Sequence, residues 1–426
     1  MKRITGDLNL IKNINELVVL NSIRNLGPIS RADLARITGL NPSTITDIVN
    51  SFLDREYVKE SNLGESTGGR KPLLLELNLP AFLMVGVLLS DELVSLVMDA
   101  RGNILSRVAE DPAPLEDAPN SSAGLSMKRV VRLIRKALKS AGIGTRSIRG
   151  IGVGITGLVD SVNGVAIFSP NLGWENVNVK QTLENEFGVP VMVDNDVKAM
   201  ALGELWFGAG KGLRHVVVFN MDEGLGAAII INGEIYRGAN GSAGEVGHSP
   251  MGDPQKRCRC GNSGCLETVT GGTALVADVR NRVLAGTQTK VLSMAGGDVR
   301  MITSQIIFEA ARSGDEVARS SIDKLAHYLG LGIASAVNEL DPECVILGGN
   351  TIYEGGELLL EGARRSCSQH VFGVSKRAIR IELARLGRDS SPIGAGALVL
   401  KRILGTGNSS LDQGIISPIM AMSKEA

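Results

Sequence analysis

The sequence lacks three features that would identify its partners directly. Lys and Arg number 45, and Asp and Glu also number 45, so no excess of positive charge indicates a nucleic-acid partner. No stretch of about 18 apolar residues is present to cross a membrane. Residues 1–7 are too polar to begin a secretory signal peptide. Any DNA contact must therefore be local and depend on shape, and we expect a cytoplasmic protein.

Cysteine is also scarce, with five residues in the chain, but three of them lie close together. Cys258, Cys260 and Cys265 follow His248 in a glycine-containing loop, and thiolates with imidazole are the ligands that zinc prefers. We predict a structural Zn²⁺ held by these four residues, because four protein ligands leave no open position for a reactive water. The alternative is a set of reduced, metal-free cysteines beside a coincident histidine.

The length of 426 residues exceeds one ordinary domain, so we expect two or three. The predicted boundaries are 1–78 for a first domain, 79–404 for a large second domain and 405–426 for a polar tail. Glycine, at 52 residues against roughly 30 expected from average usage, indicates many tight loops.

The first domain has the pattern of a winged helix-turn-helix. Ser30 to Asp33 forms a capping box, and Asn41 followed by Pro42 marks a second helix start. Apolar residues then repeat at helical spacing at Ile45, Ile48, Val49 and Phe52. A hairpin with a basic tip follows this helix and resembles a wing. The alternative is a three-helix packing module that binds nothing.

Short polar and basic side chains of this domain are the candidates for DNA contact, since they suit phosphates and base edges. The predicted DNA-binding residues are Arg31, Ser43, Thr44, Thr46, Gly69, Arg70 and Lys71. Helix-turn-helix domains read paired half-sites, so a homodimer or a higher homo-oligomer on double-stranded operator DNA is expected.

The second domain reads as an α/β unit with a repeated pattern. Three successive strands precede alternating helices and strands, and a second set of strands begins at His215. This order predicts two ribonuclease-H-like lobes with a cleft between them, the actin-like architecture. Lobe 1 is expected at about 79–198 with a C-terminal helix at 391–404, and lobe 2 at about 199–390.

Several motifs resemble those of the ROK family (repressors, open reading frames and sugar kinases). They are Gly154–Asp160, Pro170–Trp174, Val193–Asp196, Gly244–His248 and Cys258–Glu267. The resemblance covers nearly the whole chain, and the N-terminal domain is similar to the repressor branch, which includes xylose repressors. It implies a sugar site made of Asn171, Asn195, Asp196, Glu245, His248 and Glu267.

Carboxylates, amides and imidazole supply the acceptors and donors that a ring of sugar hydroxyls needs. In family kinases the residue matching Asp196 is the general base. Considered without its neighbours, the segment from Asp194 to Asp196 would be an ordinary turn at the end of a strand.

The sequence departs from the kinases at their nucleotide turns, which use glycine pairs to approach phosphates. The first turn reads Ser90-Asp91-Glu92 and the second Asp222-Glu223-Gly224, and Lys198 stands where kinases usually carry Asn. At an effective dielectric constant of about 20, one like-charge contact at 4 Å costs on the order of 4 kcal/mol. We therefore expect no kinase activity.

The resulting prediction is a non-enzymatic, sugar-responsive transcriptional repressor of carbohydrate-utilisation genes. Two alternatives remain: an active sugar kinase with a DNA-binding appendage, and a DNA-binding scaffold whose signal is a partner protein.

Overall fold

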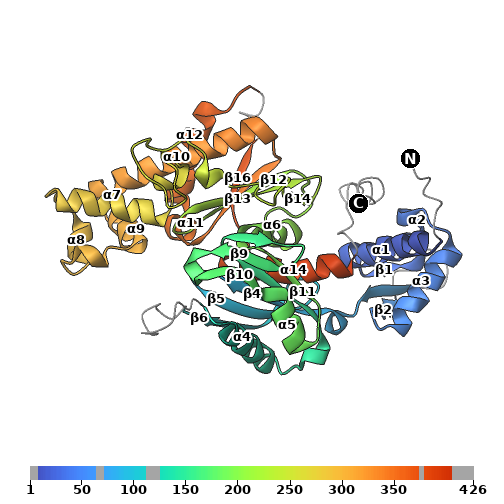
Figure 1. Cartoon of the computed structure of the whole chain (residues 1–426). Coiled ribbons are helices and arrows are strands. Elements are labelled where there is room, and N and C mark those ends of the chain that lie inside the picture. Colours follow the sequence, from blue (N-terminus) through green and yellow to red (C-terminus); the bar gives the residue numbers. More distant parts are fainter. Residues whose placement is uncertain (1–7, 64–71, 112–124, 374–378, 405–426) are drawn as a thin grey trace.

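The computed structural model describes residues 8–63, 72–111, 125–373 and 379–404. Figure 1 shows a helical head formed by the N-terminal segment, a central lobe 1 and a lobe 2 on the far side of it from the head. No helix in the described ranges is long and apolar enough to cross a membrane.

The head has the predicted winged arrangement of three helices and a small sheet. Its elements are α1 (Leu8–Leu26), β1 (Ile29–Ser30), α2 (Arg31–Thr38), α3 (Pro42–Asp54), β2 (Val58–Leu63) and β3 (Leu73–Leu77). Strands β2 and β3 form the wing hairpin, and the two residues of β1 add a third strand beside β3, in the order β1-β3-β2. The sequence analysis did not predict β1.

Capping and burial explain where the helices of the head begin and which faces they bury. The Ser30 hydroxyl accepts a hydrogen bond from the Asp33 N–H at 3.1 Å and so caps α2, and it donates one to the Asp33 carboxylate at 2.7 Å. Asn41 precedes α3, but its side chain forms no capping hydrogen bond. The predicted apolar stripe of α3 is buried at all four positions: Ile45, Ile48, Val49 and Phe52.

Lobe 1 is built on a five-stranded sheet with the order β11-β7-β4-β5-β6. The strands are β4 (Leu83–Leu89), β5 (Leu93–Met98), β6 (Ile104–Glu110), β7 (Ile148–Ile155) and β11 (Val191–Asn195). Helices α4 (Met127–Ser140) and α5 (Val179–Phe187) pack their apolar sides into the core of this lobe. A second, antiparallel sheet contains β8 (Leu158–Asp160), β9 (Val165–Ser169) and β10 (Trp174–Asn178).

Lobe 2 repeats the same strand pattern in the order β14-β13-β12-β15-β16. Its strands are β12 (Val216–Met221), β13 (Leu225–Ile231), β14 (Glu234–Tyr236), β15 (Cys344–Gly348) and β16 (Arg380–Leu383). In both lobes three antiparallel strands are followed by a fourth that pairs parallel to the first and a fifth that pairs parallel to the fourth. This duplication is the ribonuclease-H-like arrangement that the sequence predicted.

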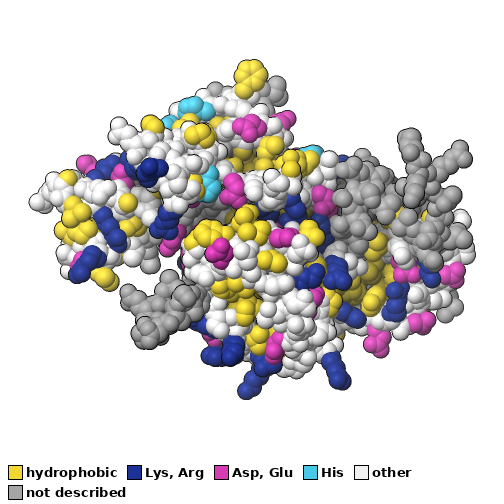
Figure 2. Space-filling view, viewed as in Figure 1, with side chains coloured by type: hydrophobic (Ala, Val, Ile, Leu, Met, Phe, Trp, Pro, Cys, Tyr) yellow, Lys and Arg dark blue, Asp and Glu magenta, His cyan; other side chains and the backbone are white. Residues whose placement is uncertain are grey.

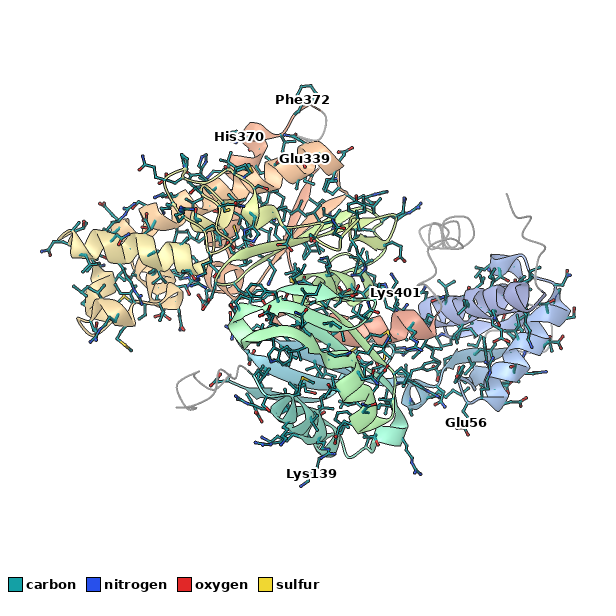
Figure 3. The ribbon with its side chains drawn as sticks, viewed as in Figure 1. Glu56, Lys139, Glu339, His370, Phe372 and Lys401 are labelled. Atoms are coloured by element: carbon teal, nitrogen blue, oxygen red, sulfur yellow. The ribbon has the colours of Figure 1, made fainter. Side chains whose placement is uncertain are left out.

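Within the described ranges, six helices pack on one face of the lobe 2 sheet, and α6 (Asp196–Phe207) covers the other. The six helices are α7 (Gly272–Leu284), α8 (Lys290–Met294), α9 (Ser304–Arg312), α10 (Glu316–Leu340), α11 (Asn350–Gly355) and α12 (Glu357–His370). At the outer end of α12, Figure 3 shows Phe372 pointing away from the protein, and 86% of this residue is exposed.

Two helices connect the head, lobe 1 and lobe 2. α6 (Asp196–Phe207) and α14 (Ser390–Ile403) pack against each other and against β7. Lys401, labelled in Figure 3, lies on α14 close to the head and forms an ion pair with Glu234 of β14. α14 therefore touches both lobes and ends beside the head.

The head and lobe 1 share one hydrophobic core. Ile23 and Leu75 of the head belong to the same buried cluster as Phe82, Met84 and Leu400 of the second domain. The Tyr57 ring of the head lies 5.1 Å from the Phe82 ring, measured between centroids. The head is therefore packed against lobe 1 and not joined to it by an exposed linker alone.

Hydrophobic side chains also reach the surface of lobe 1. Figure 2 shows them gathered near β9 and β10, where Val162 is 81% exposed and Phe168 54% exposed.

Candidate functional site

The first turn of α6 places Asn195 and Asp196 between the two lobes. The Asn195 side-chain oxygen accepts hydrogen bonds from the N–H groups of Val197 and Lys198, at 3.0 and 3.2 Å, and so caps α6. Its amide nitrogen donates to the Gly157 carbonyl at 3.1 Å and to the Asp196 carboxylate at 2.9 Å. The two predicted sugar residues are therefore held by the backbone and by each other.

Gly157 makes this contact possible. Its φ of +104° lies in the region that favours glycine, and a Cβ atom there would lie 2.4 Å from the Phe168 carbonyl oxygen. The turn between β7 and β8 can therefore bring the Gly157 carbonyl against Asn195.

Asp196 is buried in an acidic environment. Burial is the main cause that raises its pKa from 3.8 to about 7, and the charges of Asp222 and Asp91 raise it further. Hydrogen bonds from the N–H groups of Val197 and Asp196 act in the opposite direction. A carboxyl group with this pKa is present near neutral pH in both its protonated and its ionised form.

A glycine-rich loop after β14 brings the remaining sugar candidates together. His248 Nε2 lies 4.0 Å from a carboxylate oxygen of Glu245, and His248 Nδ1 lies 3.5 Å from Glu267 Oε1. Lys198 connects this group to Asp196, because the charges of both Glu245 and Asp196 act on its ammonium group. Three of the six predicted residues, Asp196, Glu245 and Glu267, thus lie around the imidazole of His248 and the ammonium group of Lys198.

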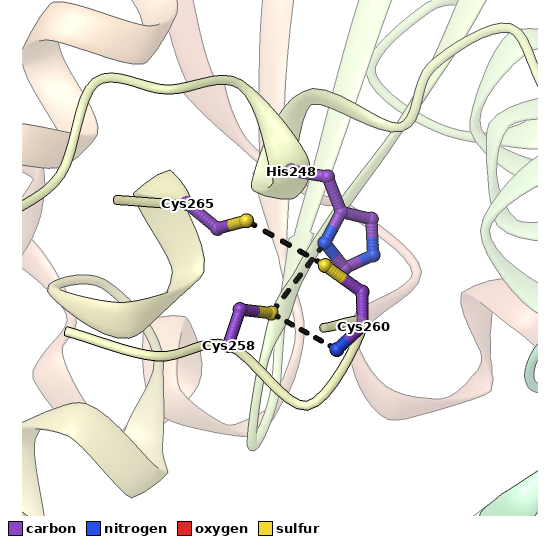
Figure 4. Close-up of side chains that lie close together, drawn as sticks. All are labelled: His248, Cys258, Cys260 and Cys265. Carbon is purple, nitrogen blue, oxygen red and sulfur yellow. Dashed lines mark hydrogen bonds between the residues drawn. The ribbon is translucent and has the colours of Figure 1, made fainter. Parts of the chain in front are cut away.

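The Nδ1 side of His248, which faces Glu267, also faces the cysteine cluster (Figure 4), and the Cys258 thiol donates to Glu267 Oε1 at 2.8 Å. His248 Nδ1 lies 3.8 Å from Cys258 Sγ, and Cys260 Sγ lies 3.7 Å from Cys265 Sγ. The ligand atoms of all four residues lie within 4.8 Å of one another. A tetrahedral zinc with bonds of about 2.3 Å to sulfur requires sulfur atoms about 3.8 Å apart, so the cluster fits this ion.

Asn171 approaches the site from the β9–β10 connection. Its side-chain amide donates to Asp91 Oδ1 at 3.1 Å. Burial is the main cause that raises the Asp91 pKa, with Glu223 and Asp222 raising it further. Asn171 therefore adjoins the acidic group beside Asp196.

Two cationic side chains tie the lobes together around this site, and one of them was missed by the sequence analysis. Arg237 of lobe 2 donates two hydrogen bonds to the Asp194 carboxylate at the end of β11, at 2.8 and 2.5 Å. Lys198 of α6 donates to the Gly241 carbonyl at 2.7 Å. Burial lowers the Lys198 pKa. Arg237 carries no local sequence signal, since its partner is distant in the chain.

The turn after β12 is closed by its own acidic side chain. Asp222 Oδ1 accepts a hydrogen bond from the Asn350 N–H at 2.5 Å, and its backbone carbonyl accepts one from the Thr351 hydroxyl at 2.9 Å. Gly349 permits this approach, because a Cβ atom there would lie 2.5 Å from the Met221 carbonyl oxygen. The backbone N–H that follows the Gly348-Gly349 pair therefore already donates its hydrogen bond to a carboxylate of the protein.

Some of the predicted DNA-binding residues of the head are exposed, and others are partly buried or paired within the head. Ser43 and Thr46 are exposed at the start of α3, Thr44 is half-buried, and the Thr46 hydroxyl donates to the Pro42 carbonyl at 2.8 Å. Arg31 is engaged by Glu60 of the wing at 3.1 Å. Gly69, Arg70 and Lys71 lie outside the described residues.

Comparison with known proteins assigns both domains of the chain to protein families. The model of the ROK family matches residues 91–402, and the model of the MarR family matches residues 12–63 in the head. The chain belongs to the ROK family. This ROK protein is 33% identical over 403 residues to a xylose repressor of Caldicellulosiruptor bescii, an alignment that covers 94% of this chain and 98% of the relative.

Solved structures agree with the fold of both domains. A ROK family transcriptional regulator, described as a homologue of the Escherichia coli MLC protein, matches with a TM-score of 0.78 and 29% identity. The match covers 92% of this chain and 96% of that one. A ROK glucokinase from Streptomyces griseus, in complex with glucose and AMPPNP, matches with a TM-score of 0.65 and 33% identity. It covers 74% of this chain and 98% of its own. The winged helix-turn-helix and the actin-like sugar kinase fold are thus confirmed.

Proposed function

We propose that this ROK protein is a sugar-responsive transcriptional repressor of carbohydrate-utilisation genes whose kinase-like domain binds a sugar without phosphorylating it. The observation that carries the proposal is the hydrogen bond from the Asn350 N–H to Asp222. It closes the turn that kinases use for phosphates, while the sugar residues around Asp196 and His248 remain in place.

The head supports a role in DNA binding. Its helices have the helix-turn-helix arrangement, and α3 exposes Ser43 and Thr46 at the end that enters a major groove in such domains. A homodimer would present two heads to paired half-sites. The xylose repressor and the ROK transcriptional regulator among its relatives share the combination of a head and a ROK domain over nearly the full chain.

The cysteine cluster supports a structural Zn²⁺ in the proposed repressor. His248, Cys258, Cys260 and Cys265 would hold the ion through His248 Nδ1 and three thiolates. The ion would fix the orientation of the imidazole, so that Nε2 faces Glu245 and the sugar. The ion supplies rigidity here and no bond-making step.

Operator binding with and without sugar tests the proposal. Fluorescence anisotropy should show the full-length protein bound to a DNA fragment from its own promoter region, with the affinity changed by a sugar from a panel of mono- and disaccharides. Asp196→Asn should raise the dissociation constant of that sugar roughly 10- to 100-fold, because a charge-assisted hydrogen bond contributes about 1.5–3 kcal/mol. It should leave sugar-free operator affinity unchanged.

An active kinase with a DNA-binding appendage is the competing function. In that case a coupled ATPase assay would detect sugar-dependent turnover, and Asp196→Asn would abolish it because the general base is lost. Turnover in the parent protein would overturn the proposal. If no saccharide changes operator binding, a scaffold whose signal is a partner protein becomes the better account.

A further inference from the structure

A cavity of about 930 Å³ lies between lobe 2 and the β4–β5 turn of lobe 1, which contributes Asp91. Asp91, Asp222 and Glu223 stand at one part of its wall, and α7 supplies Thr273 and Ala277 at another. Its volume is near the upper end of the roughly 300–1,000 Å³ found for small-molecule sites. The closed Asp222 turn therefore leaves a large space unfilled.

The cavity adjoins the sugar candidates at two contacts. The Asn171 amide donates to Asp91, which lines the cavity, at 3.1 Å. On the other side, a Cβ atom at Gly224 would lie 2.9 Å from Glu267 Oε2, so the acidic turn abuts a sugar candidate. A ligand that reaches from Asp196 and His248 to the cavity would therefore pass Asp91.

The charges at this junction disfavour phosphate. Asp91, Asp222 and Glu223 lie close enough that the last two raise the pKa of the first, and Asp222 also acts on Asp196. A phosphate group would meet several like charges here. Three arginines line the cavity: Arg300 pairs with Asp298, Arg280 donates to the Arg300 and Ile302 carbonyls, and the charge of Arg259 acts on Asp91.

The same groups suit neutral hydroxyls. Carboxylates accept strong hydrogen bonds from hydroxyl groups, and Asn350, Thr273 and Ser304 of the cavity wall can both donate and accept. Arg259 of the zinc loop adds a donor. This donor and acceptor set resembles the sugar site itself more than a nucleotide site.

We propose that the cavity is a second saccharide subsite, so that the effector is a neutral oligosaccharide of two or more rings. One ring lies at Asp196 and His248, and the next lies against Asp91, Asp222 and α7. This inference rests on the proposed function and adds to it the class of effector. The carboxylates at the junction disfavour sugar phosphates and nucleotides there.

Calorimetry on the full-length protein with xylose, xylobiose and xylotriose tests the subsite, with glucose and cellobiose as a second series. The longer member of the recognised series should bind at least about tenfold more tightly than its monosaccharide, the gain expected from one or two added charge-assisted hydrogen bonds. Ala277→Trp should fill the cavity from an exposed position of α7 and lower oligosaccharide affinity to that of the monosaccharide, whose own affinity should not change. Thr273→Trp provides a second blocking variant if the first does not fold.

A matched control is Ala285→Trp, an exposed alanine just after α7 that does not line the cavity. It should leave all affinities unchanged. Equal affinities for monosaccharide and oligosaccharide, or an Ala277→Trp variant that binds both like the parent, would overturn the subsite while leaving the repressor proposal intact. Tighter binding of glucose 6-phosphate or AMPPNP than of any neutral sugar would also overturn it. No binding of any saccharide would contradict the proposed function itself.

Discussion

The Asp222 carboxylate accepts a hydrogen bond from the Asn350 backbone N–H, with 2.5 Å between oxygen and nitrogen. A second hydrogen bond, from the Asn220 side-chain amide at 2.8 Å, holds its other oxygen. Backbone N–H groups that follow glycines are common phosphate donors. In this chain the donor is already satisfied by an anion belonging to the protein.

Opening this turn should create affinity for nucleotide. The double variant Asp222→Gly, Glu223→Thr restores the Gly-Thr-Gly sequence expected of family kinases and removes two negative charges. We expect AMPPNP binding to strengthen at least about tenfold in calorimetry, since one like-charge contact costs about 4 kcal/mol at an effective dielectric constant of 20. Asp323→Asn, an exposed carboxylate on α10, is the control for a general charge effect. Tight AMPPNP binding by the parent would contradict this account.

Zinc content can be measured directly. Freshly purified, reduced protein should carry about one zinc per chain, because the four ligand atoms fit one tetrahedral ion. Cys260→Ser should lose the metal and weaken sugar binding, since His248 would no longer be oriented. Cys367→Ser, at a buried cysteine outside the cluster, should retain the zinc. Elemental analysis that finds no zinc in the parent would refute the assignment.

Asp196 should make stability depend on pH. Its pKa rises from 3.8 to about 7 on folding, so the native state retains a proton that the unfolded state loses between about pH 4 and 7. The free energy of unfolding contributed by this group therefore falls as pH rises through that window. Asp196→Asn removes the effect and should stabilise the sugar-free protein by up to about 4 kcal/mol at pH 8, and by little near pH 4.

Urea denaturation of the two proteins at pH 4.5, 6 and 8 measures this difference. The exposed Asp323→Asn variant should follow the parent at every pH. A constant difference between Asp196→Asn and the parent across the range would show that the Asp196 pKa is not raised.

Arg24 should couple the head to the sugar site. Its guanidinium lies 4.4 Å from the centre of the Trp206 ring and 5.7 Å from that of Phe207, at the end of α6 opposite Asp196. Burial lowers its pKa to about 10. Arg24→Ala should reduce the change in operator affinity caused by sugar by about two- to thirtyfold, because a cation–π contact contributes about 0.5–2 kcal/mol.

Arg24→Lys retains the cation and should keep part of this effect, while Arg36→Ala, on the exposed side of α2, should change neither sugar affinity nor coupling. Operator titrations with and without sugar measure the coupling in each variant. If sugar changes the operator affinity of Arg24→Ala as much as that of the parent, the contact of Arg24 with α6 does not couple the head to the sugar site.

Local patterns predicted most of the elements because their causes lie close together in the sequence. The N-cap at Ser30, the buried stripe from Ile45 to Phe52 and the spacing of the cysteines each depend on neighbouring residues. The start of α3 at Asn41 and Pro42 was also predicted correctly, although the Asn41 side chain makes no capping hydrogen bond.

Contacts between distant segments could not be predicted in this way. The pairing of β1 with β3, the ion pair of Arg31 with Glu60, and the bidentate contact of Arg237 with Asp194 join residues without a shared periodicity. The resemblance named the sugar residues, but it did not show that Asp91 and Asp222 face Asp196. The contacts of Arg70 and Lys71 with DNA stay a prediction.

The shared core of the head and lobe 1 limits how this ROK protein can be modified. Cutting the chain after β3 would leave Phe82, Met84 and Leu400 without the head residues that cover them. The isolated second domain would then expose an apolar patch and tend to aggregate. A head transplanted from a relative would need matching residues on η1 (Leu79–Phe82) and α14. In calorimetry the head and lobe 1 should unfold in one cooperative transition. A chimaera whose head does not match the residues of η1 and α14 should unfold in two transitions.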